Sequence, residues 1–283
     1  MTPGDWRAKG ATFDWRGHEI FYRTDGAGDP LLAIHGFPTA SYDYVRIWDR
    51  LAAKHRVVTL DMIGFGFSAK PRDFRYSIMK QADLYEAFIE REGIDRYRIL
   101  AHDYGNTVAQ ELLARRRGNI VSVCFLNGGL FPETHRALVS QKLLASPIGS
   151  LVARLIDFKG FSANMRRIWG THHLPDTELY AMWSLVKAND GLPVMAKLIG
   201  YIAERKQYRE RWVGAIVDAA MPIRLIDGLD DPVSGAHMVA RYRELVPHPD
   251  IVELPGIGHY PQVEAPDETV AAILAFTSGG AGA

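Results

Sequence analysis

The sequence contains a single cysteine, no excess charge of either sign and no long apolar run. Among its 283 residues Cys124 is alone, which excludes an intramolecular disulfide and a cysteine metal cluster, and its apolar neighbours predict a buried thiol. Lys and Arg number 33 and so do Asp and Glu, so no net field favours nucleic acid or an anionic membrane. We expect a small neutral hydrophobic substrate together with water, and neither a metal nor another cofactor.

Targeting and membrane segments are also lacking. Residues 1–7 have no apolar signal-peptide core, and no segment is apolar enough to cross a bilayer, so we expect a cytoplasmic protein without a membrane span. The sequence leaves open whether it is a monomer or a homodimer. The glycine-bearing loop 61–68 lacks the third glycine of the dinucleotide motif G-x-G-x-x-G, and Lys70-Pro71 follows where a helix should begin. We interpret this loop as structural, holding Asp61 and Ser68 near one edge of a sheet.

Short apolar runs alternate with helical patterns along the chain. Residues 11–16 and 19–24 predict an antiparallel hairpin, and buried strands are predicted at 31–34, 56–60, 97–101, 121–126, 222–227 and 251–254. A helix is predicted at 77–92, with Ser77 as its cap. The alternation is typical of an α/β fold, a mostly parallel eight-stranded sheet with helices on both faces. Ligands of such sheets bind beyond the carboxyl ends of the strands.

A long segment without strand patterns interrupts this alternation. Amphipathic helices are predicted within it at 136–144, 177–188 and 194–211. We therefore divide the chain into an α/β core at 1–129 and 221–277, an inserted helical cap at 130–220 and a flexible tail at 278–283. Aromatic residues of the cap, among them Tyr180, Trp183 and Tyr201, are candidates for a substrate pocket, although aromatics at helical spacing also pack in ordinary cores.

One predicted strand ends at an aspartate held between small residues. Ala101 stands two residues before Asp103 and Gly105 two after, which is the spacing of a nucleophile elbow with aspartate in place of serine. An aspartate is ionised at neutral pH and can attack an electrophilic carbon, forming an ester on the enzyme. The competing interpretation is that Asp103 caps the helix that follows it.

Two later loops supply an acid and a histidine. Asp231 and His259 each follow a predicted strand, and the order nucleophile, acid, histidine is that of a hydrolase triad. Asp230 competes for the acid position, and we favour Asp231 because it stands three residues after Gly228. An acid could instead follow the strand at 121–126, where this chain has Asn127. In the proposed second step His259, oriented by Asp231, takes a proton from the water that hydrolyses the Asp103 ester.

Further motifs connect these loops to a known family. His-Gly-Phe-Pro at 35–38 and Gly-His-Tyr-Pro at 258–261 accompany the loop 61–68 and the elbow at 101–105. Together they make the chain, from about residue 21 to 276, resemble the epoxide hydrolase and haloalkane dehalogenase branch of the α/β-hydrolase superfamily. The segments 127–136 and 211–215 are more specific and resemble the mesoderm-specific transcript hydrolases of the same superfamily. The resemblance implies an α/β-hydrolase fold with an inserted cap and an oxyanion hole formed by the backbone amides of Phe37 and Tyr104.

The resemblance also bears on the substrate. Dehalogenases of this branch hold the halide with a tryptophan directly after the nucleophile and an Asn or Trp at the oxyanion turn, where this chain has Tyr104 and Phe37. Phe37 and His102 look like their counterparts in epoxide hydrolases, which use cap tyrosines as proton donors, a role Tyr201 would take. We therefore expect epoxide hydrolysis, with dehalogenation, ester hydrolysis and a noncatalytic binding role as alternatives. His35, His102, Tyr180, Trp183 and Tyr201 are the expected substrate contacts.

Overall fold

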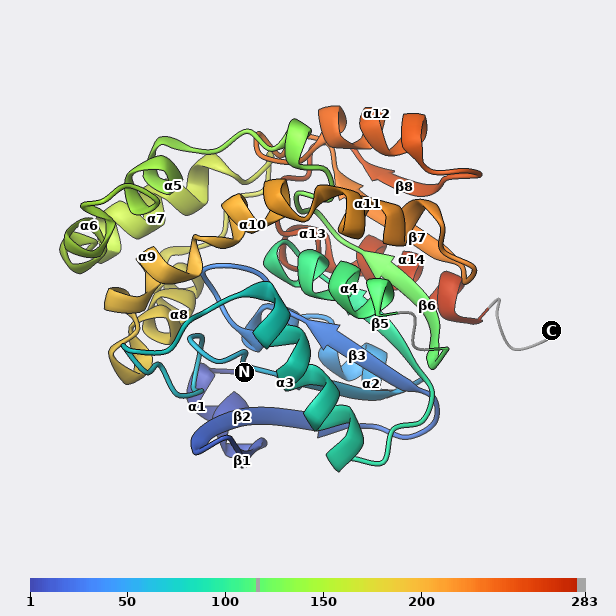
Figure 1. Cartoon of the computed structure of the whole chain (residues 1–283), viewed down its shortest axis with the longest axis horizontal. Helices are drawn as coiled ribbons and strands as arrows, with labels where there is room; N and C mark the ends of the chain where they lie inside the picture. Colours follow the sequence, from blue (N-terminus) through green and yellow to red (C-terminus); the bar gives the residue numbers. More distant parts are fainter. Residues whose placement is uncertain (116–117, 279–283) are drawn as a thin grey trace.

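The computed structural model describes residues 1–115 and 118–278, and its short apolar runs form one eight-stranded sheet (Figure 1). The strands are β1 (Ala11–Trp15), β2 (His18–Asp25), β3 (Pro30–Ile34), β4 (Arg56–Leu60), β5 (Tyr97–Ala101), β6 (Ile120–Phe125), β7 (Ile223–Gly228) and β8 (Asp250–Leu254). Their order across the sheet is β1-β2-β4-β3-β5-β6-β7-β8. The pairs β1 with β2 and β2 with β4 are antiparallel and the others parallel, which confirms the predicted sheet.

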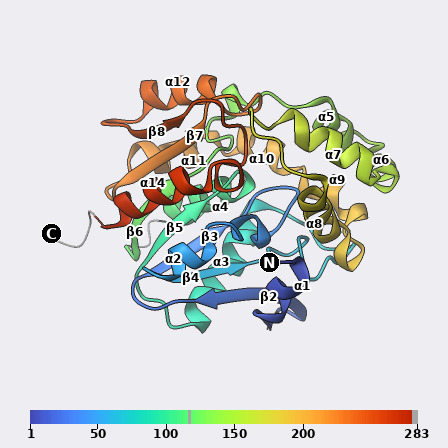
Figure 2. The ribbon, with the colours of Figure 1, turned by 180° about the vertical axis from the view of Figure 1, so that it is seen from behind.

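Helices cover both faces because the strand residues are apolar on both sides. In β3, Leu32 and Ile34 pack into one buried cluster, whereas Leu31 and Ala33 pack into the other. The first cluster lies under α3 (Ile78–Arg91), α4 (Tyr104–Ala114), α11 (Arg209–Val217) and α12 (Ala236–Leu245). The second lies under α1 (Pro3–Ala8), η1 (Ser41–Tyr44), α2 (Trp48–Ala52) and α14 (Pro266–Ser278), and Figure 2 shows α2 and α14 on that face. Cys124 is buried and unpaired in the second cluster, as predicted.

Between β6 and β7 the described chain forms helices and no strand. These are η2 (Pro132–Thr134), α5 (Val139–Leu144), α6 (Gly149–Leu155), α7 (Phe158–Arg167), α8 (Asp176–Lys187), η3 (Ala188–Asp190), η4 (Leu192–Val194), α9 (Met195–Leu198), α10 (Tyr201–Gln207) and α11. Figure 1 shows α5 to α9 gathered at one end of the molecule. The last of these helices, α11, instead packs along α4, because Arg211 and the Trp212 indole both donate to the buried Glu111 carboxylate.

Some predicted boundaries agree with the structure and others do not. The helix predicted from Ser77 is α3, where the Ser77 hydroxyl accepts a bond from the Lys80 amide. The helix predicted at 136–144 begins only at Val139, because the Arg136 amide donates to the Val233 carbonyl of another loop at 3.3 Å. The helix predicted at 194–211 is broken into four elements, and α6 and α7 were not predicted.

The C-terminal end of the predicted division is described only in part. Ser278, the first residue of the predicted flexible tail, is the last residue of α14, and residues 279–283 lie outside the described part of the chain. Within residues 1–115 and 118–278, no helix has the length and hydrophobicity that crossing a membrane requires.

The loop 61–68 is structural, as interpreted from the sequence. The Asp61 carboxylate accepts bonds from the backbone amides of Ser41 at 2.8 Å and Phe67 at 2.7 Å. The Ser68 hydroxyl accepts from the Phe21 amide of β2. These bonds fix the loop, which follows β4, against β2 and the segment after β3, at the edge of the sheet where the predicted functional residues follow their strands.

Candidate active site

The turn between β5 and α4 is tight, and it places Asp103 at its apex. Asp103 has φ 46° and ψ −105°, a conformation that costs a non-glycine residue free energy. Small neighbours make the turn possible. A methyl group added to Gly105 would lie 2.3 Å from the Ile34 carbonyl oxygen, and one added to Gly128 would lie 2.6 Å from Cα of Asp103. The local sequence therefore folds as the elbow that its spacing predicts.

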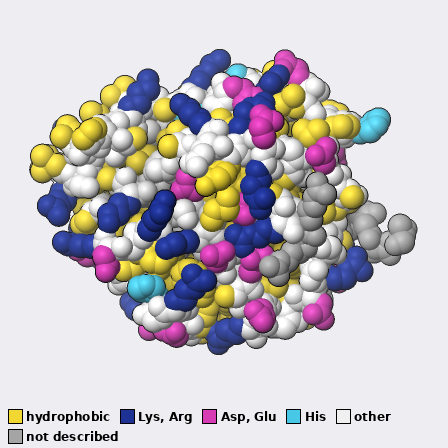
Figure 3. All heavy atoms as spheres, in the orientation of Figure 1, with side chains coloured by type: hydrophobic (Ala, Val, Ile, Leu, Met, Phe, Trp, Pro, Cys, Tyr) yellow, Lys and Arg dark blue, Asp and Glu magenta, His cyan; other side chains and the backbone are white. Residues whose placement is uncertain are grey.

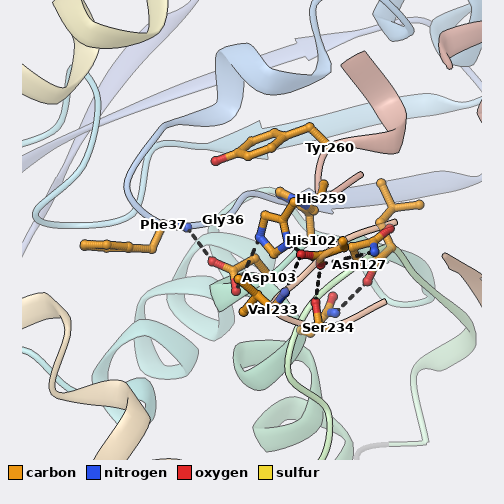
Figure 4. A network of polar contacts seen from close by, with 12 residues as sticks. Gly36, Phe37, His102, Asp103, Asn127, Val233, Ser234, His259 and Tyr260 are labelled. Carbon is orange, nitrogen blue, oxygen red and sulfur yellow. Dashed lines mark hydrogen bonds and ion pairs between the residues drawn. The ribbon is translucent and has the colours of Figure 1, made fainter. Parts of the chain in front are cut away.

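The Asp103 carboxylate points into the site rather than along its own helix. Its Oδ2 accepts a hydrogen bond from the Phe37 amide at 3.1 Å, and its Oδ1 lies 3.9 Å from Nε2 of His259 (Figure 4). The side chain makes no capping bond to α4, although Asp103 occupies the cap position. The capping interpretation is therefore wrong for this structure, because the carboxylate faces Phe37 and His259 instead of the amides of α4.

The structure brings His259 and Asp231 together next to Asp103. Nδ1 of His259 donates to Oδ2 of Asp231 at 2.6 Å, so the proton on Nδ1 leaves Nε2 facing Asp103. The Asp231 carboxylate is itself held by the Val233 amide at 2.8 Å and the Ser234 hydroxyl at 2.6 Å. Because this buried carboxylate is held by its other partners, the position of the imidazole is closely defined.

The two competitors for the acid position take other places. Asp230 is exposed and accepts a bond from the Gly256 amide at 3.3 Å, away from the imidazole. Asn127 is buried between strand ends, where its amide nitrogen donates to the Gly228 carbonyl at 3.0 Å and to Asp231 at 3.3 Å. Asn127 therefore supports the Asp231 carboxylate rather than replacing it.

Electrostatics favour an imidazolium in the resting site. Burial of the His259 ring opposes its charge, but the Asp231 carboxylate, its hydrogen bond and the charge of Asp103 outweigh burial and raise the pKa of His259 to about 9. Burial likewise acts against the charge of Asp231, and the His259 charge and hydrogen bonds overcome it to lower the pKa of Asp231. At neutral pH a cation therefore lies between two carboxylates.

The two predicted oxyanion donors are the backbone amides of Phe37, in the turn after β3, and of Tyr104, the residue directly after Asp103. The Phe37 amide already contacts Oδ2, the oxygen that would become an oxyanion when Asp103 is attacked as an ester. The Tyr104 amide is the first of α4, and the unpaired amides at a helix start favour negative charge. Its side chain is buried, with ring centroids 5.3 Å from Phe65 and 4.9 Å from Tyr201.

A small, largely apolar cavity adjoins Asp103 and His259. Its volume is about 90 Å³. Its wall contains Phe37, Pro38, Asp103, Leu138, Ser140, Gln141, Leu144, Ile156, Phe161, Asn164, Met165, Ile168, Met195, Val233 and His259. Most of these residues come from α5, α7 and the ends of their connecting loops, so the helical segment between β6 and β7 shapes the space in front of Asp103.

The two predicted histidine contacts are buried outside this wall. His102 donates from Nε2 to the His259 carbonyl at 2.8 Å, and burial, followed by the His259 charge, lowers its pKa to about 3. His35 accepts a bond on Nε2 from the Met62 amide at 3.1 Å. The structure thus gives both rings a role in fixing loops: His102 holds the loop that carries His259, and His35 joins the turn 35–38 to the loop 61–68.

The three predicted cap aromatics lie in different surroundings. Tyr201 is buried next to the oxyanion turn, with ring centroids 6.1 Å from Phe37, and its hydroxyl finds no hydrogen-bond partner within the described residues. Trp183 packs on Phe161, a wall residue, and does not itself line the cavity. Tyr180 is 59% exposed on the outer side of α8, so the structure does not bring it to the triad.

Sequence reasoning missed Arg205. This arginine of α10 is 2% exposed, donates to the Asp103 carbonyl at 2.8 Å and to the Thr107 hydroxyl at 2.6 Å, and lies 3.8 Å from Oδ1 of Asp103. Its guanidinium also covers the Tyr201 ring at 4.5 Å. The only signal in the sequence was that Arg205 stands four residues after Tyr201, on the same side of a helix. This signal was not sufficient, because an arginine in an amphipathic helix is usually assigned to the solvent-exposed face.

Known proteins resemble this chain in sequence and in structure. A sequence model of the alpha/beta hydrolase family matches residues 31–272. The human mesoderm-specific transcript homolog protein is 41% identical over 96% of this chain and 86% of its own length. Haloalkane dehalogenase 2 of Mycobacterium tuberculosis is 29% identical over 93% of this chain and 92% of its own length. A solved alpha/beta hydrolase fold protein from Burkholderia ambifaria superimposes with a TM-score of 0.81 at 25% identity, covering 94% of this chain and 97% of that one.

The charge arrangement predicts the titration of His259. In the free protein the imidazole should titrate near pH 9, and in Asp103→Asn, which removes one neighbouring charge, at a clearly lower pH. Because the pKa of His259 in the folded state lies above the ordinary 6.5, its contribution to the free energy of unfolding is complete below pH 6.5 and is lost as the pH rises through 9. Nitrogen-15 NMR of the ring measures this. An unchanged pKa in Asp103→Asn would contradict the coupling.

Proposed function

Because the chain belongs to the alpha/beta hydrolase family, we propose that Asp103 is its nucleophile and that it opens epoxides to diols through a covalent ester. One observation carries the proposal. The Asp103 carboxylate stands at the apex of a strained turn, at the wall of an apolar cavity, between the Phe37 amide and the His259 imidazole. A carboxylate presented in this way suits attack on an uncharged electrophilic carbon.

In the first step Asp103 attacks a ring carbon of the epoxide and the carbon–oxygen bond opens. The Asp103 charge disappears into the ester, and the departing oxygen needs one proton. Loss of that charge removes one of the causes that raise the pKa of His259, so the imidazolium releases a proton, which replaces the one that Tyr201 gives to the departing oxygen. Charge and protons therefore balance within the site.

In the second step the neutral His259 acts as a general base. It takes a proton from water, which attacks the Asp103 carboxyl carbon while the Phe37 and Tyr104 amides hold the oxyanion. Collapse of this intermediate releases the diol and restores both the Asp103 carboxylate and the imidazolium. Asp231 keeps the ring oriented throughout, since its bond to Nδ1 is independent of the reacting nitrogen.

Tyr201 is the proposed proton donor to the ring oxygen. Its hydroxyl is buried without a partner in the described chain, and burial, followed by the Asp103 charge, raises the pKa of Tyr201, which keeps the phenol protonated. The contact of its ring with both Phe37 and Tyr104 supports a position close to the reacting carbon. Tyr201 is not itself part of the cavity wall but contacts Phe37, which is, and no other tyrosine of the described residues lines the cavity, so a second donor is lacking.

Dehalogenation is the second candidate. It is favoured by the similarity to the relative named Haloalkane dehalogenase 2 and by the largely apolar wall of the cavity next to Asp103. Against it stand Tyr104 and Phe37, which occupy the positions where the resembled dehalogenases carry halide-binding side chains. Both reactions share the Asp103 ester, and they differ in whether the leaving group needs a proton.

Trapping the ester tests the nucleophile. In His259→Gln the second step should slow about 10²–10⁴-fold, so the Asp103 ester should accumulate. Intact-mass and peptide mass spectrometry after incubation with styrene oxide, 1-bromobutane or a fatty-acid epoxide would detect it. The adduct mass identifies the electrophile, and halide release marks a dehalogenase.

The matched control is the double variant Asp103→Asn/His259→Gln, which should form no adduct with any of the three compounds. An adduct on another residue, or equal labelling of the control, would remove Asp103 from the mechanism. Absence of any adduct in His259→Gln would leave ester hydrolysis or a binding role.

Tyr201→Phe separates the two candidate reactions. We expect alkylation of Asp103 by styrene oxide to slow about 10²-fold, because a positioned acid is lost, while alkylation by 1-bromobutane stays unchanged, because bromide leaves without a proton. Single-turnover rates followed by mass spectrometry measure both. Equal slowing with the two compounds would mean that Tyr201 only supports the packing of the oxyanion turn.

A further inference from the structure

The exposed apolar side chains of this protein are concentrated in one place. Of the seven large hydrophobic residues that are exposed in the described chain, five lie between residues 139 and 155. These five, here called the apolar patch, are Val139, Leu143, Ile148, Leu151 and Leu155, with Val139 68% and Leu155 74% exposed. Single exposed apolar residues need no explanation, but a contiguous group of them does.

The helical spacing puts the patch on one outer side of α5 and α6. Val139 and Leu143 stand one turn apart on α5, and Leu151 and Leu155 one turn apart on α6, with Ile148 immediately before that helix. The inner side of the same segment is already used, because Leu144 lines the cavity and Ala153 is fully buried. The patch therefore has no packing role in the described fold.

The surroundings of the patch are basic. Residues 136–167 contain six Lys and Arg residues and one acidic residue, Asp157, although the whole chain has equal numbers of each sign. The six are Arg136, Lys142, Arg154, Lys159, Arg166 and Arg167; all are exposed, and Arg166 forms an ion pair with Asp176 of α8. Figure 3 shows apolar side chains gathered at the end of the molecule where α5 and α6 lie, with Lys and Arg side chains at their margin. The zero net charge of the chain conceals this local excess.

We propose that the apolar patch and its basic margin bind the surface of an anionic lipid bilayer. Aliphatic side chains that project from short helices enter the boundary between headgroups and acyl chains, and neighbouring cations contact the phosphates. The position at one extremity of the molecule lets α5 and α6 touch a flat surface before the rest of the chain does. A second copy of this chain is a poorer occupant, because it would bring the same basic margin against this one.

The inference does not depend on the reaction. Binding to vesicles involves residues of the outer side of α5 and α6, whereas the triad and the cavity lie on the inner side. Failure of lipid binding would leave the proposed hydrolysis intact, and the converse also holds.

The test is sedimentation of the full-length protein with sucrose-loaded vesicles of phosphatidylcholine, alone or with about one third phosphatidylglycerol. We expect binding to the anionic vesicles at low ionic strength and weaker binding in salt of about 0.5 M, which screens the cations. The double variant Leu151→Ser/Leu155→Ser should lower the apparent affinity about tenfold or more. Because both side chains are exposed, the variant should keep the wild-type circular dichroism spectrum and melting temperature.

Matched controls distinguish binding through the apolar patch from nonspecific adsorption to the vesicles. Tyr180→Ser removes an exposed aromatic outside the patch and should bind as the wild type does. Lys142→Gln/Arg154→Gln should weaken binding to anionic vesicles, whereas Lys206→Gln, on α10, should not. Equal binding to both vesicle types, no binding at low salt, or unchanged affinity of Leu151→Ser/Leu155→Ser would overturn the proposal. Conversion of a dimer to a monomer by that variant in light scattering, without vesicle binding, would instead assign the patch to a second copy.

Discussion

The backbone turn at Asp103 is the constraint on which the rest of the site depends. Its φ of 46° and ψ of −105° are maintained because the neighbouring strand β3 and the loop after β6 approach so closely that Gly105 and Gly128 have no room for a side chain. The strain directs the carboxylate away from the amides of its own helix and toward the Phe37 amide and the His259 ring. In a relaxed helix cap the carboxylate oxygens of the same residue would accept hydrogen bonds from backbone amides. They would then be unavailable for the proposed attack on a carbon atom.

The buried charges around this turn form a balanced set. Asp103 and Asp231 are the anions, and Arg205 and the His259 imidazolium are the cations, all within a region that is at most 6% exposed at the side chains. Removing one member of a buried ionic set lowers the free energy of unfolding by about 3–5 kcal/mol, because the charge of its partner is left uncompensated. Conversion of Asp103 into an ester removes one member chemically. The proposed mechanism uses that imbalance, since the excess positive charge is relieved when His259 loses its proton.

Much of the fold could be predicted because parallel strands and their loops carry local signals. The hairpin, the buried strands, the cap at Ser77 and the α/β-hydrolase superfamily were predicted correctly. The positions of Asp103, Asp231 and His259 could be predicted because each residue follows a strand that the sequence pattern indicates. The helices between β6 and β7 were harder, because tertiary bonds such as that of the Arg136 amide to Val233 override helical periodicity. Arg205 was not predicted, since only burial distinguishes it from a solvated arginine.

In the proposed reaction the oxygen delivered to the product comes first from Asp103 and only later from water. A single turnover in oxygen-18 water, with protein in excess over styrene oxide, tests it directly. We expect unlabelled diol from this first turnover and one oxygen-18 atom in the peptide that carries Asp103, because water attacks the carboxyl carbon of the ester. Labelled diol together with an unlabelled Asp103 peptide would mean that water attacks the epoxide itself and that no ester forms on Asp103.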